Sequence, residues 1–397
     1  MRRLLGLTIL LALALAPAAR ADSDLLVGIV DDQLKWTAHP KPTTTILRDL
    51  GIGGLRVPLT WRRGNARLTK TDAVIMNRIV VGTFPMRIVL TVSGPAREAP
   101  QSDAERAQFC AFVRDALARF PSINDVTIWN EVNSNDFWQP QFDARGASAA
   151  PASYVALLAR CYDTLHQLRP SVNVMTDTSP RGNDNPFGVS NAGHSPGAFV
   201  RKMGEAFRAS GRTRPIFDNV GHHPYGDFSL ESPFARHPNT GSIAQGDVDK
   251  LFTAYADAFA GSDQPAIGSG GVRVFYLENG FETTVVASKR ALYKGTERAR
   301  TVGYEALHRE QLLDAVRLAY CQPHVASFFN FLLTDEKNLA GWQSGLLWAD
   351  GSPKPSYSGF RAVVREVKRR AVDCVAVRKK EAETLAGGFI VLPPRDK

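Results

Sequence analysis

Two stretches, Val126-Thr-Ile-Trp-Asn-Glu131 and Val274-Phe-Tyr-Leu-Glu278, each join an apolar run of strand length to a glutamate. Their β-branched and aromatic residues favour β-strands. A polar stretch begins directly after each glutamate, with Val132-Asn133 in the first case and Asn279-Gly280 in the second. Each strand is therefore expected to end there. Taking a carboxylate out of water is costly unless another group pairs with it. We therefore expect two carboxyl groups held for chemistry at the rim of a sheet.

Apolar runs of this kind alternate with amphipathic helical stretches along the chain, and runs without strict alternation favour parallel strands covered on both faces. Eight strand–helix units predict one α/β domain, a (β/α)8 TIM barrel. Strands are expected at Leu25–Val30, Gly54–Pro58, Met86–Val92, Val126–Trp129, Val172–Thr176, Asn219–His222, Val272–Leu277 and Val325–Asn330. Helices are expected at residues 43–50, 71–81, 103–119, 151–168, 196–210, 247–260, 296–320 and 356–371.

The connections between these elements differ in length. Helix-to-strand links are short, as at Gly51–Gly53, whereas several strand-to-helix links are long. Long loops inside a compact domain usually have a function. In a barrel they emerge at the C-terminal face, where barrel active sites lie. Both glutamates are expected at that end, so loop length and carboxylate position agree.

Composition and the N-terminus bear on the class of protein. The chain has 397 residues, 44% apolar and 22% charged, which is a soluble globular composition with material for a large core. Arg2 and Arg3, the apolar stretch Leu4–Pro17 and Ala19-Arg-Ala21 are typical of a secretory signal peptide over residues 1–21. A membrane anchor is the alternative, but the stretch is short for a span. We expect export, extracellular or periplasmic, with no membrane attachment after cleavage.

The remaining chain is expected to comprise the barrel, residues 22–374, and a basic C-terminal tail, residues 375–397. Removing residues 1–21 changes the formal charge from +9 to +6, because three of the 48 basic residues and none of the 39 acidic ones are lost. Basic runs such as that from Arg365 to Lys380 are mostly solvated helix faces. No nucleic-acid motif is found, so we expect no nucleic-acid partner, and we expect a monomer.

Four cysteines in an exported chain are candidates for disulfides. Cys110 and Cys161 fall near the middle of predicted helices, and Cys321 and Cys374 near the ends of two others. In a barrel these helices are neighbours and parallel, with the cysteines of each pair at similar heights. This favours Cys110–Cys161 and Cys321–Cys374, and four unpaired buried cysteines are the alternative.

Trp129-Asn-Glu-Val-Asn133 resembles the strand-four signature of the clan of retaining glycoside hydrolases with barrel folds, which includes cellulases, mannanases, xylanases and β-xylosidases. Similar segments for strands two, six and seven and for the close of the barrel follow in the clan's order: Gly51–Trp61, His222–Tyr225, Tyr276–Gly280, Gly345–Leu347 and Asp350–Tyr357. The resemblance implies cleavage of O-glycosidic bonds, β-linked, in a carbohydrate substrate. One departure is Phe328-Phe-Asn-Phe331, which lacks the tryptophan often found after strand eight.

Retaining glycoside hydrolysis needs two carboxyl groups about 5–5.5 Å apart, and Glu131 and Glu278 are the candidates. Glu131 would act as general acid and then as general base. Burial and the negative Glu278 would raise its pKa, so that it is protonated near neutral pH. Glu278 would be the nucleophile and must stay ionised. Arg56 can supply a positive neighbour and Tyr225 a hydrogen bond.

Further residues are expected to bind the substrate. Asn130 would hydrogen-bond the sugar 2-hydroxyl, and His223 would bind the sugar or orient a carboxylate. Among the aromatic residues of the mouth loops, Trp138 and Trp342 are the best candidates for stacking on a sugar face. Asp177, at the end of strand five, could touch substrate or cap a turn, and we favour the turn.

Two other function classes are considered. His222-His223 suggests a metal-dependent barrel hydrolase, but a catalytic metal needs about three protein ligands. Strand one ends in Val30-Asp-Asp32 without a His-x-His pair, so no metal and no cofactor is expected. A catalytically inactive carbohydrate-binding barrel would have the same shape. The presence of both glutamates with Asn130, Arg56 and Tyr225 argues against that loss.

Overall fold

The computed structural model describes residues 24–31, 33–37, 39–188, 193–297 and 302–387. The predicted signal peptide lies outside these residues, and so does the end of the predicted tail.

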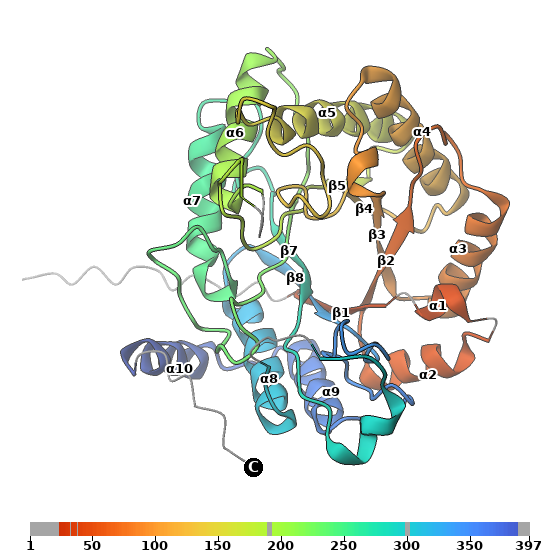
Figure 1. Cartoon of the computed structure of the whole chain (residues 1–397), viewed down its shortest axis with the longest axis vertical. Coiled ribbons are helices and arrows are strands. Elements are labelled where there is room, and N and C mark those ends of the chain that lie inside the picture. The colour runs from red at the N-terminus through yellow and green to blue at the C-terminus, as the bar shows by residue number, and fades with distance from the viewer. Residues whose placement is uncertain (1–23, 32, 38, 189–192, 298–301, 388–397) are drawn as a thin grey trace, which may run out of the picture.

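The described chain forms a barrel of parallel strands with a ring of helices outside it (Figure 1). Within the eight-stranded sheet the order is β5-β4-β3-β2-β1-β8-β7-β6, and parallel bridges from Met175 to Asn219 and from Thr178 to His222 join the two edges. The predicted (β/α)8 barrel is therefore confirmed. The strands are β1 (Leu26–Val30), β2 (Gly54–Thr60), β3 (Arg87–Ser93), β4 (Asp125–Ile128), β5 (Asn173–Met175), β6 (Val220–His222), β7 (Val274–Asn279) and β8 (Val325–Phe331).

The helices follow the strands, and most match the predicted ranges within a few residues. Capping boxes start two of them, Thr69 with Asp72 and Ser102 with Glu105. α8 begins at Glu305 and not near residue 296, since its N-cap residue Tyr304 is extended. The helices are α1 (Gln33–Trp36), α2 (Lys41–Leu50), α3 (Lys70–Thr83), α4 (Asp103–Arg119), α5 (Ala150–Leu168), α6 (Pro196–Ala209), α7 (Val248–Phe259), α8 (Glu305–Cys321), α9 (Pro355–Lys368) and α10 (Cys374–Ala386).

Side chains fill the inside of the barrel, so it is a packed core and not a pore. Val89, Met175, Leu277 and Phe329 belong to this inner cluster. Where β5 and β6 meet, a Cβ on Gly221 would lie 2.2 Å from the carbonyl oxygen of Thr176. Glycine is required there because the two backbones approach closely as the barrel closes.

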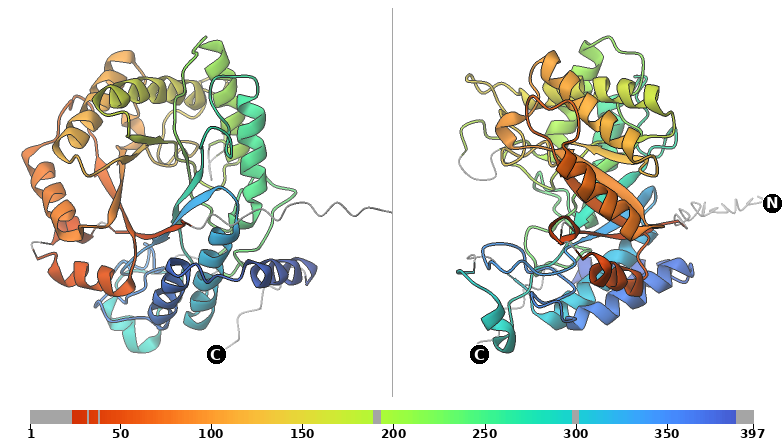
Figure 2. Two further views of the ribbon diagram at one scale, coloured as in Figure 1. Left: turned by 180° about the vertical axis from the view of Figure 1, so that it is seen from behind. Right: turned by 90° about the vertical axis from the view of Figure 1, so that its right-hand side faces the viewer.

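Long loops project from one end of the barrel, as the side view of Figure 2 shows. They follow β4, β5, β6, β7 and β8, the strands after which long connections were expected. This end carries the carboxyl ends of the strands, and therefore both glutamates.

Both predicted disulfides are confirmed. Cys110–Cys161 joins α4 to α5, and Cys321 at the end of α8 bonds to Cys374 at the start of α10. Residues 374–386 form α10, so the first part of the predicted basic tail is helical. The disulfide and the Asp373 cap, which accepts two backbone hydrogen bonds, give this segment an anchored start.

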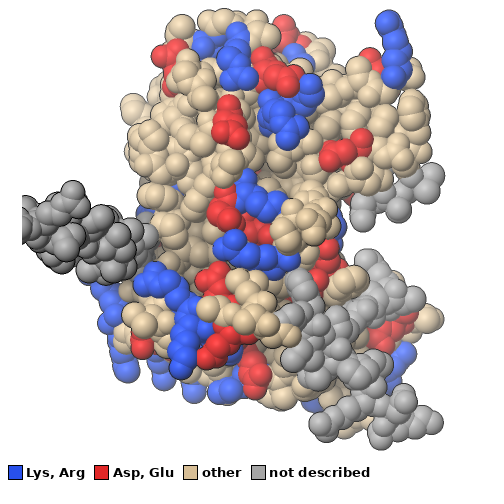
Figure 3. All heavy atoms as spheres, turned by 90° about the vertical axis from the view of Figure 1, so that its left-hand side faces the viewer, with Lys and Arg blue, Asp and Glu red and all other residues tan. Residues whose placement is uncertain are grey.

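Charged side chains of both signs are interspersed on the face shown in Figure 3. Basic residues near the C-terminus are paired, since Arg370 lies 2.8 Å from Asp24 and Lys380 lies 2.7 Å from Asp314. Within the described part of the chain, no helix has both the length and the apolar character needed to cross a membrane.

Candidate active site

The loop after β4 turns Glu131 toward the mouth of the barrel through an uncommon backbone conformation. Trp129 and Glu131 have φ values of 70° and 42°, in the left-handed region that few non-glycine residues adopt. The Trp129 ring is fully buried, and its Nε1 donates to the carbonyl of Phe137 at 2.7 Å. Strain of this kind gathers at functional sites where the surrounding packing holds it in place.

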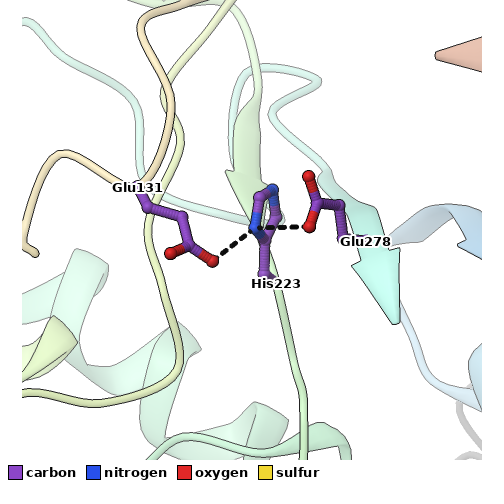
Figure 4. A group of neighbouring side chains, drawn as sticks. All are labelled: Glu131, His223 and Glu278. Carbon is purple, nitrogen blue, oxygen red and sulfur yellow. Dashed lines mark hydrogen bonds and ion pairs between the residues drawn. The ribbon is translucent and has the colours of Figure 1, made fainter. Parts of the chain in front are cut away.

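Glu131, His223 and Glu278 face one another across the mouth (Figure 4). Nδ1 of His223 lies 2.8 Å from Oε1 of Glu131 and 3.6 Å from Oε2 of Glu278. A carboxylate oxygen of Glu131 and one of Glu278 are within 4.8 Å of each other and of the ring nitrogen. Two acids separated by more than a hundred residues therefore share one opening, as the strand-end pattern indicated.

Glu278 receives hydrogen bonds from two of its predicted partners. Nη1 of Arg56 donates to its Oε1, and the hydroxyl of Tyr225 donates to its Oε2 at 3.1 Å. Arg56 is almost completely buried, and its Nη2 also donates to Oδ1 of Asn130 at 2.8 Å. Burial and the charge of Glu278 raise the pKa of Tyr225 well above its ordinary value, so its hydroxyl remains a donor.

The protonation states of Glu131 and His223 differ. Burial raises the pKa of Glu131, and the negative charges of Glu278 and Asp177 raise it further. The hydrogen bond and charge of His223 lower the same pKa, but the net shift is upward. Burial disfavours the charged form of His223, but Asp177 and Glu278 outweigh it and raise the pKa of His223 to about 10. At neutral pH the ring is therefore an imidazolium, and Glu131 is biased toward its protonated form.

A cavity of about 730 Å³ opens above these groups and is lined from all eight strand ends. Glu131, Glu278 and Asn130 lie at its floor, and Trp342 lies in its wall. The Trp342 ring packs beside Tyr225 at 5.5 Å and edge-on to Phe331 at 5.6 Å. Phe331, the last residue of β8, and Trp342, from the following loop, therefore give the cavity wall an aromatic surface.

Trp138 does not reach the cavity, which corrects the expectation that it contacts sugar. Its side chain has no exposed surface, and it packs edge-on against Trp129 at 5.4 Å and Tyr154 at 5.6 Å. The loop folds back after Phe137, so the cavity receives Phe137 while Trp138 enters the core between the barrel and α5.

Asp177 is the residue whose role was underestimated. It has no exposed surface, and its carboxylate lies 3.0 Å from Nη2 of Arg56 and 3.0 Å from Nε2 of His223. It therefore bridges two cations and does not cap a turn. The rule that identified Glu131 and Glu278, an acid at the end of an apolar strand, also applies to Asp177.

Two groups of described residues place three metal-type ligand atoms within 4.8 Å of one another: Glu131, His223 and Glu278, and Asp227, Glu231 and His237. A metal needs the unprotonated imidazole. The pKa of His223 is raised to about 10, and the hydrogen bonds that His237 donates to Asp247 and Glu231 raise its pKa to about 10 as well. In each group the histidine is therefore favoured as a cation that pairs with the surrounding carboxylates.

No family model matches the chain, and no curated protein matches its sequence. Its fold matches a family 39 glycoside hydrolase from Bacteroides cellulosilyticus WH2 with a TM-score of 0.60 and 15% identity, covering 86% of this chain and 64% of that one. A calcium-binding mutant of Bacteroides uniformis beta-glucuronidase 2 matches with a TM-score of 0.54 and 13% identity, covering 87% and 36%. An exo-beta-1,4-mannosidase from Opitutaceae bacterium strain TAV5 matches with a TM-score of 0.53 and 13% identity, covering 88% of this chain and 61% of that one.

The chain spans less than two thirds of the length of each of these structures. At such low identity the likeness concerns the fold. The chain has the (β/α)8 barrel of these glycosidases.

Proposed function

We propose that the protein is a retaining glycoside hydrolase that cleaves β-linked O-glycosidic bonds by double displacement. The observation that carries this proposal is the pair Glu131 and Glu278, whose nearest-facing oxygens lie within 4.8 Å at the floor of a cavity. Inverting enzymes hold their carboxyl groups about 6.5–9.5 Å apart to leave room for a water, and retaining enzymes about 5–5.5 Å. The glycosidase names among the structural neighbours support the same class.

In the first step a carboxylate oxygen of Glu278 attacks the anomeric carbon, while Glu131 gives its proton to the departing glycosidic oxygen. The product is an ester between the sugar and Glu278. In the second step Glu131 takes a proton from water, whose oxygen attacks the anomeric carbon and releases Glu278. Arg56 and Tyr225 favour the ionised nucleophile, and Asn130 is the proposed partner of the sugar 2-hydroxyl.

The charges around the cavity favour a neutral sugar. Among the described residues that line it, Arg56 and Arg181 are the arginines, and both are already paired, Arg56 with Glu278 and Arg181 with Asp227. Three more carboxylates line the cavity: Asp136, Glu282 and Glu336. A uronic acid would meet like charge here. We expect turnover of an aryl β-glucoside, β-xyloside or β-mannoside, and little turnover of the β-glucuronide.

Secretion is also proposed. Two disulfides within one barrel are typical of proteins that fold in an oxidising compartment. Fractionation of an expressing cell, followed by N-terminal sequencing of the exported chain, tests this. Cleavage after Ala21 is the expected result, and an uncleaved chain retained in the cell contradicts it.

A panel of aryl β-glycosides and β-linked polysaccharides tests the proposed activity. The wild type is expected to release product, and Glu131→Gln and Glu278→Gln each to lose turnover, by at least about 10²-fold. Loss of activity with a chelator would instead indicate a metal-dependent hydrolase. Binding without turnover by the wild type across the panel would indicate a carbohydrate-binding barrel.

A further inference from the structure

We propose that Asp177 is a positioning residue for the reaction: its buried carboxylate fixes Arg56 and His223 and, through them, orients Glu278 and Glu131. The inference rests on the proposed function, because it names the group that holds the two proposed reacting carboxyls in place. Asp177 itself has no exposed surface and is not among the residues that line the cavity. It therefore acts through other side chains and does not touch the sugar.

The two oxygens of Asp177 have separate partners. Oδ2 accepts from Nη2 of Arg56 at 3.0 Å, and Oδ1 lies 3.0 Å from Nε2 of His223. Each cation then turns its other nitrogen toward the cavity, Nη1 of Arg56 to Glu278 and Nδ1 of His223 to Glu131 at 2.8 Å. The carboxylate of Asp177 thus aligns two other carboxyl groups. It acts on Glu278 through the two Nη atoms of Arg56 and on Glu131 through the two ring nitrogens of His223.

The charges of this cluster balance only when Asp177 is ionised. In the proposed resting state, with Glu131 protonated as the acid and Glu278 ionised as the nucleophile, Arg56 and His223 carry two positive charges and Asp177 supplies the second negative charge. The pairs lie in the interior, where Arg56 is 2% exposed and Asp177 and His223 are 0% exposed. An uncompensated charge at such depth is strongly unfavourable. Without Asp177, the imidazolium would lose a counter-ion that faces its Nε2.

The consequence concerns the direction of one hydrogen bond. As an imidazolium, His223 must donate from Nδ1 to the carboxyl group of Glu131. A neutral His223 can leave Nδ1 unprotonated, and the ring would then accept a proton from Glu131 in place of the glycosidic oxygen. The titratable and charged groups in and around this cluster come from five strand ends and two helices: Arg56, Glu131, Asp177, His222, Tyr225 and Glu278, with Tyr154 of α5 and Tyr255 of α7.

Asp177→Asn tests the proposal because it keeps the side-chain shape and removes the charge. We expect kcat on an aryl β-glycoside to fall by about 10²-fold, as when reacting groups are misplaced by about 1 Å, with KM little changed. Titration of the His223 ring by nitrogen NMR supplies a second readout. The ring signal is assigned by its absence from the spectrum of His223→Gln. The wild-type ring is expected to lose its proton near pH 10, and the variant ring at or below about 6.5.

Asp125→Asn is the matched control. Asp125 is also buried and paired with an arginine, Arg87, but it lies at the start of β4, at the opposite end of the barrel. This variant is expected to lower the melting temperature while kcat and the His223 titration stay at wild-type values. A role for Asp177 in folding alone would make the two variants behave alike.

Wild-type kcat with unchanged His223 titration in Asp177→Asn would overturn the proposal. If that variant does not fold, the wild-type titration still decides, since a ring that is neutral at pH 7 overturns it. If the wild type cleaves no glycoside, the proposed function fails. The titrations of the wild type and variant would then still show whether Asp177 holds His223 as a cation.

Discussion

Replacing Arg56 by methionine should destabilise the protein strongly while preserving the volume of the side chain. The guanidinium contacts three groups, Glu278, Asn130 and Asp177, and is almost completely buried. Methionine keeps the apolar stem but leaves two carboxylates without this cation. Removing one partner of a buried ion pair costs about 3–5 kcal/mol.

The structure places the expected loss at the lower end of that range. Asp177 and Glu278 keep one cation, because His223 lies 3.0 Å from the first and 3.6 Å from the second. We therefore expect a loss of about 3 kcal/mol in the free energy of unfolding at neutral pH. For a chain of 397 residues that corresponds to a fall in melting temperature of roughly 4 °C. Protonation of the carboxylates at acidic pH removes the unpaired charge, so the loss should shrink as the pH falls.

Urea unfolding of the wild type and Arg56→Met at pH 7 and at pH 4 measures both quantities. Arg361→Met is the control, because Arg361 pairs with Asp49 on the surface and such pairs contribute little. An Arg56→Met loss below about 1 kcal/mol, equal at both pH values and similar to the control, would refute the reasoning that the Arg56 cluster is a desolvated charge network.

Further outcomes concern three other residues and one disulfide. Glu131→Gln should unfold at a higher temperature than the wild type at pH 8 but not at pH 4: the folded pKa of Glu131 is raised above 4.5, so wild-type stability falls as pH rises through that raised value. An equal melting temperature at pH 8 would contradict this. Trp342→Ala should raise KM by up to about tenfold with kcat retained, from loss of an aromatic contact of about 1.5 kcal/mol, whereas Trp138→Phe should change stability and leave KM alone. The double variant Cys321→Ser with Cys374→Ser should lose about 2–4 kcal/mol in urea unfolding, because the bond closes a separation of 53 residues, and should keep wild-type kcat.

The fold could be predicted because its determinants are local. Each strand is a short apolar run, and the observed limits differ from the expected ones by a residue or two, as at Arg87–Ser93 against Met86–Val92. The two glutamates were found by the same local rule, since each ends an apolar run at the loop-bearing face. Parallel strands bring those ends together without any detail of the loops.

Loop residues could not be placed in the same way. Two neighbouring side chains in the loop after β4 lie in different environments, since Phe137 lines the cavity and Trp138 is in the core. That choice depends on how the loop folds back over α5, and both residues have large aromatic rings that suit a core or a sugar face. The aromatic wall at Trp342 was predicted, but its pairing with Phe331 depends on two segments that meet only in the folded protein.

Asp177 shows a different limit. A single acid after a strand is equally consistent with a turn cap and with a buried counter-ion, because the sequence does not show which cations approach it. Here Arg56 and His223 come from β2 and from the end of β6, and both reach the same carboxylate. The distinction needed the three-dimensional arrangement of three strand ends.

The central claim is that Glu278 attacks the sugar while Glu131 supplies the proton. Its most direct test is to incubate the protein with an activated 2-fluoro aryl glycoside, whose ester intermediate breaks down slowly, and to locate the added mass by peptide mass spectrometry. The account predicts one sugar per chain, attached to Glu278, and no adduct in Glu278→Gln. A sugar attached to another residue, or turnover of the reagent without any covalent adduct, would contradict it.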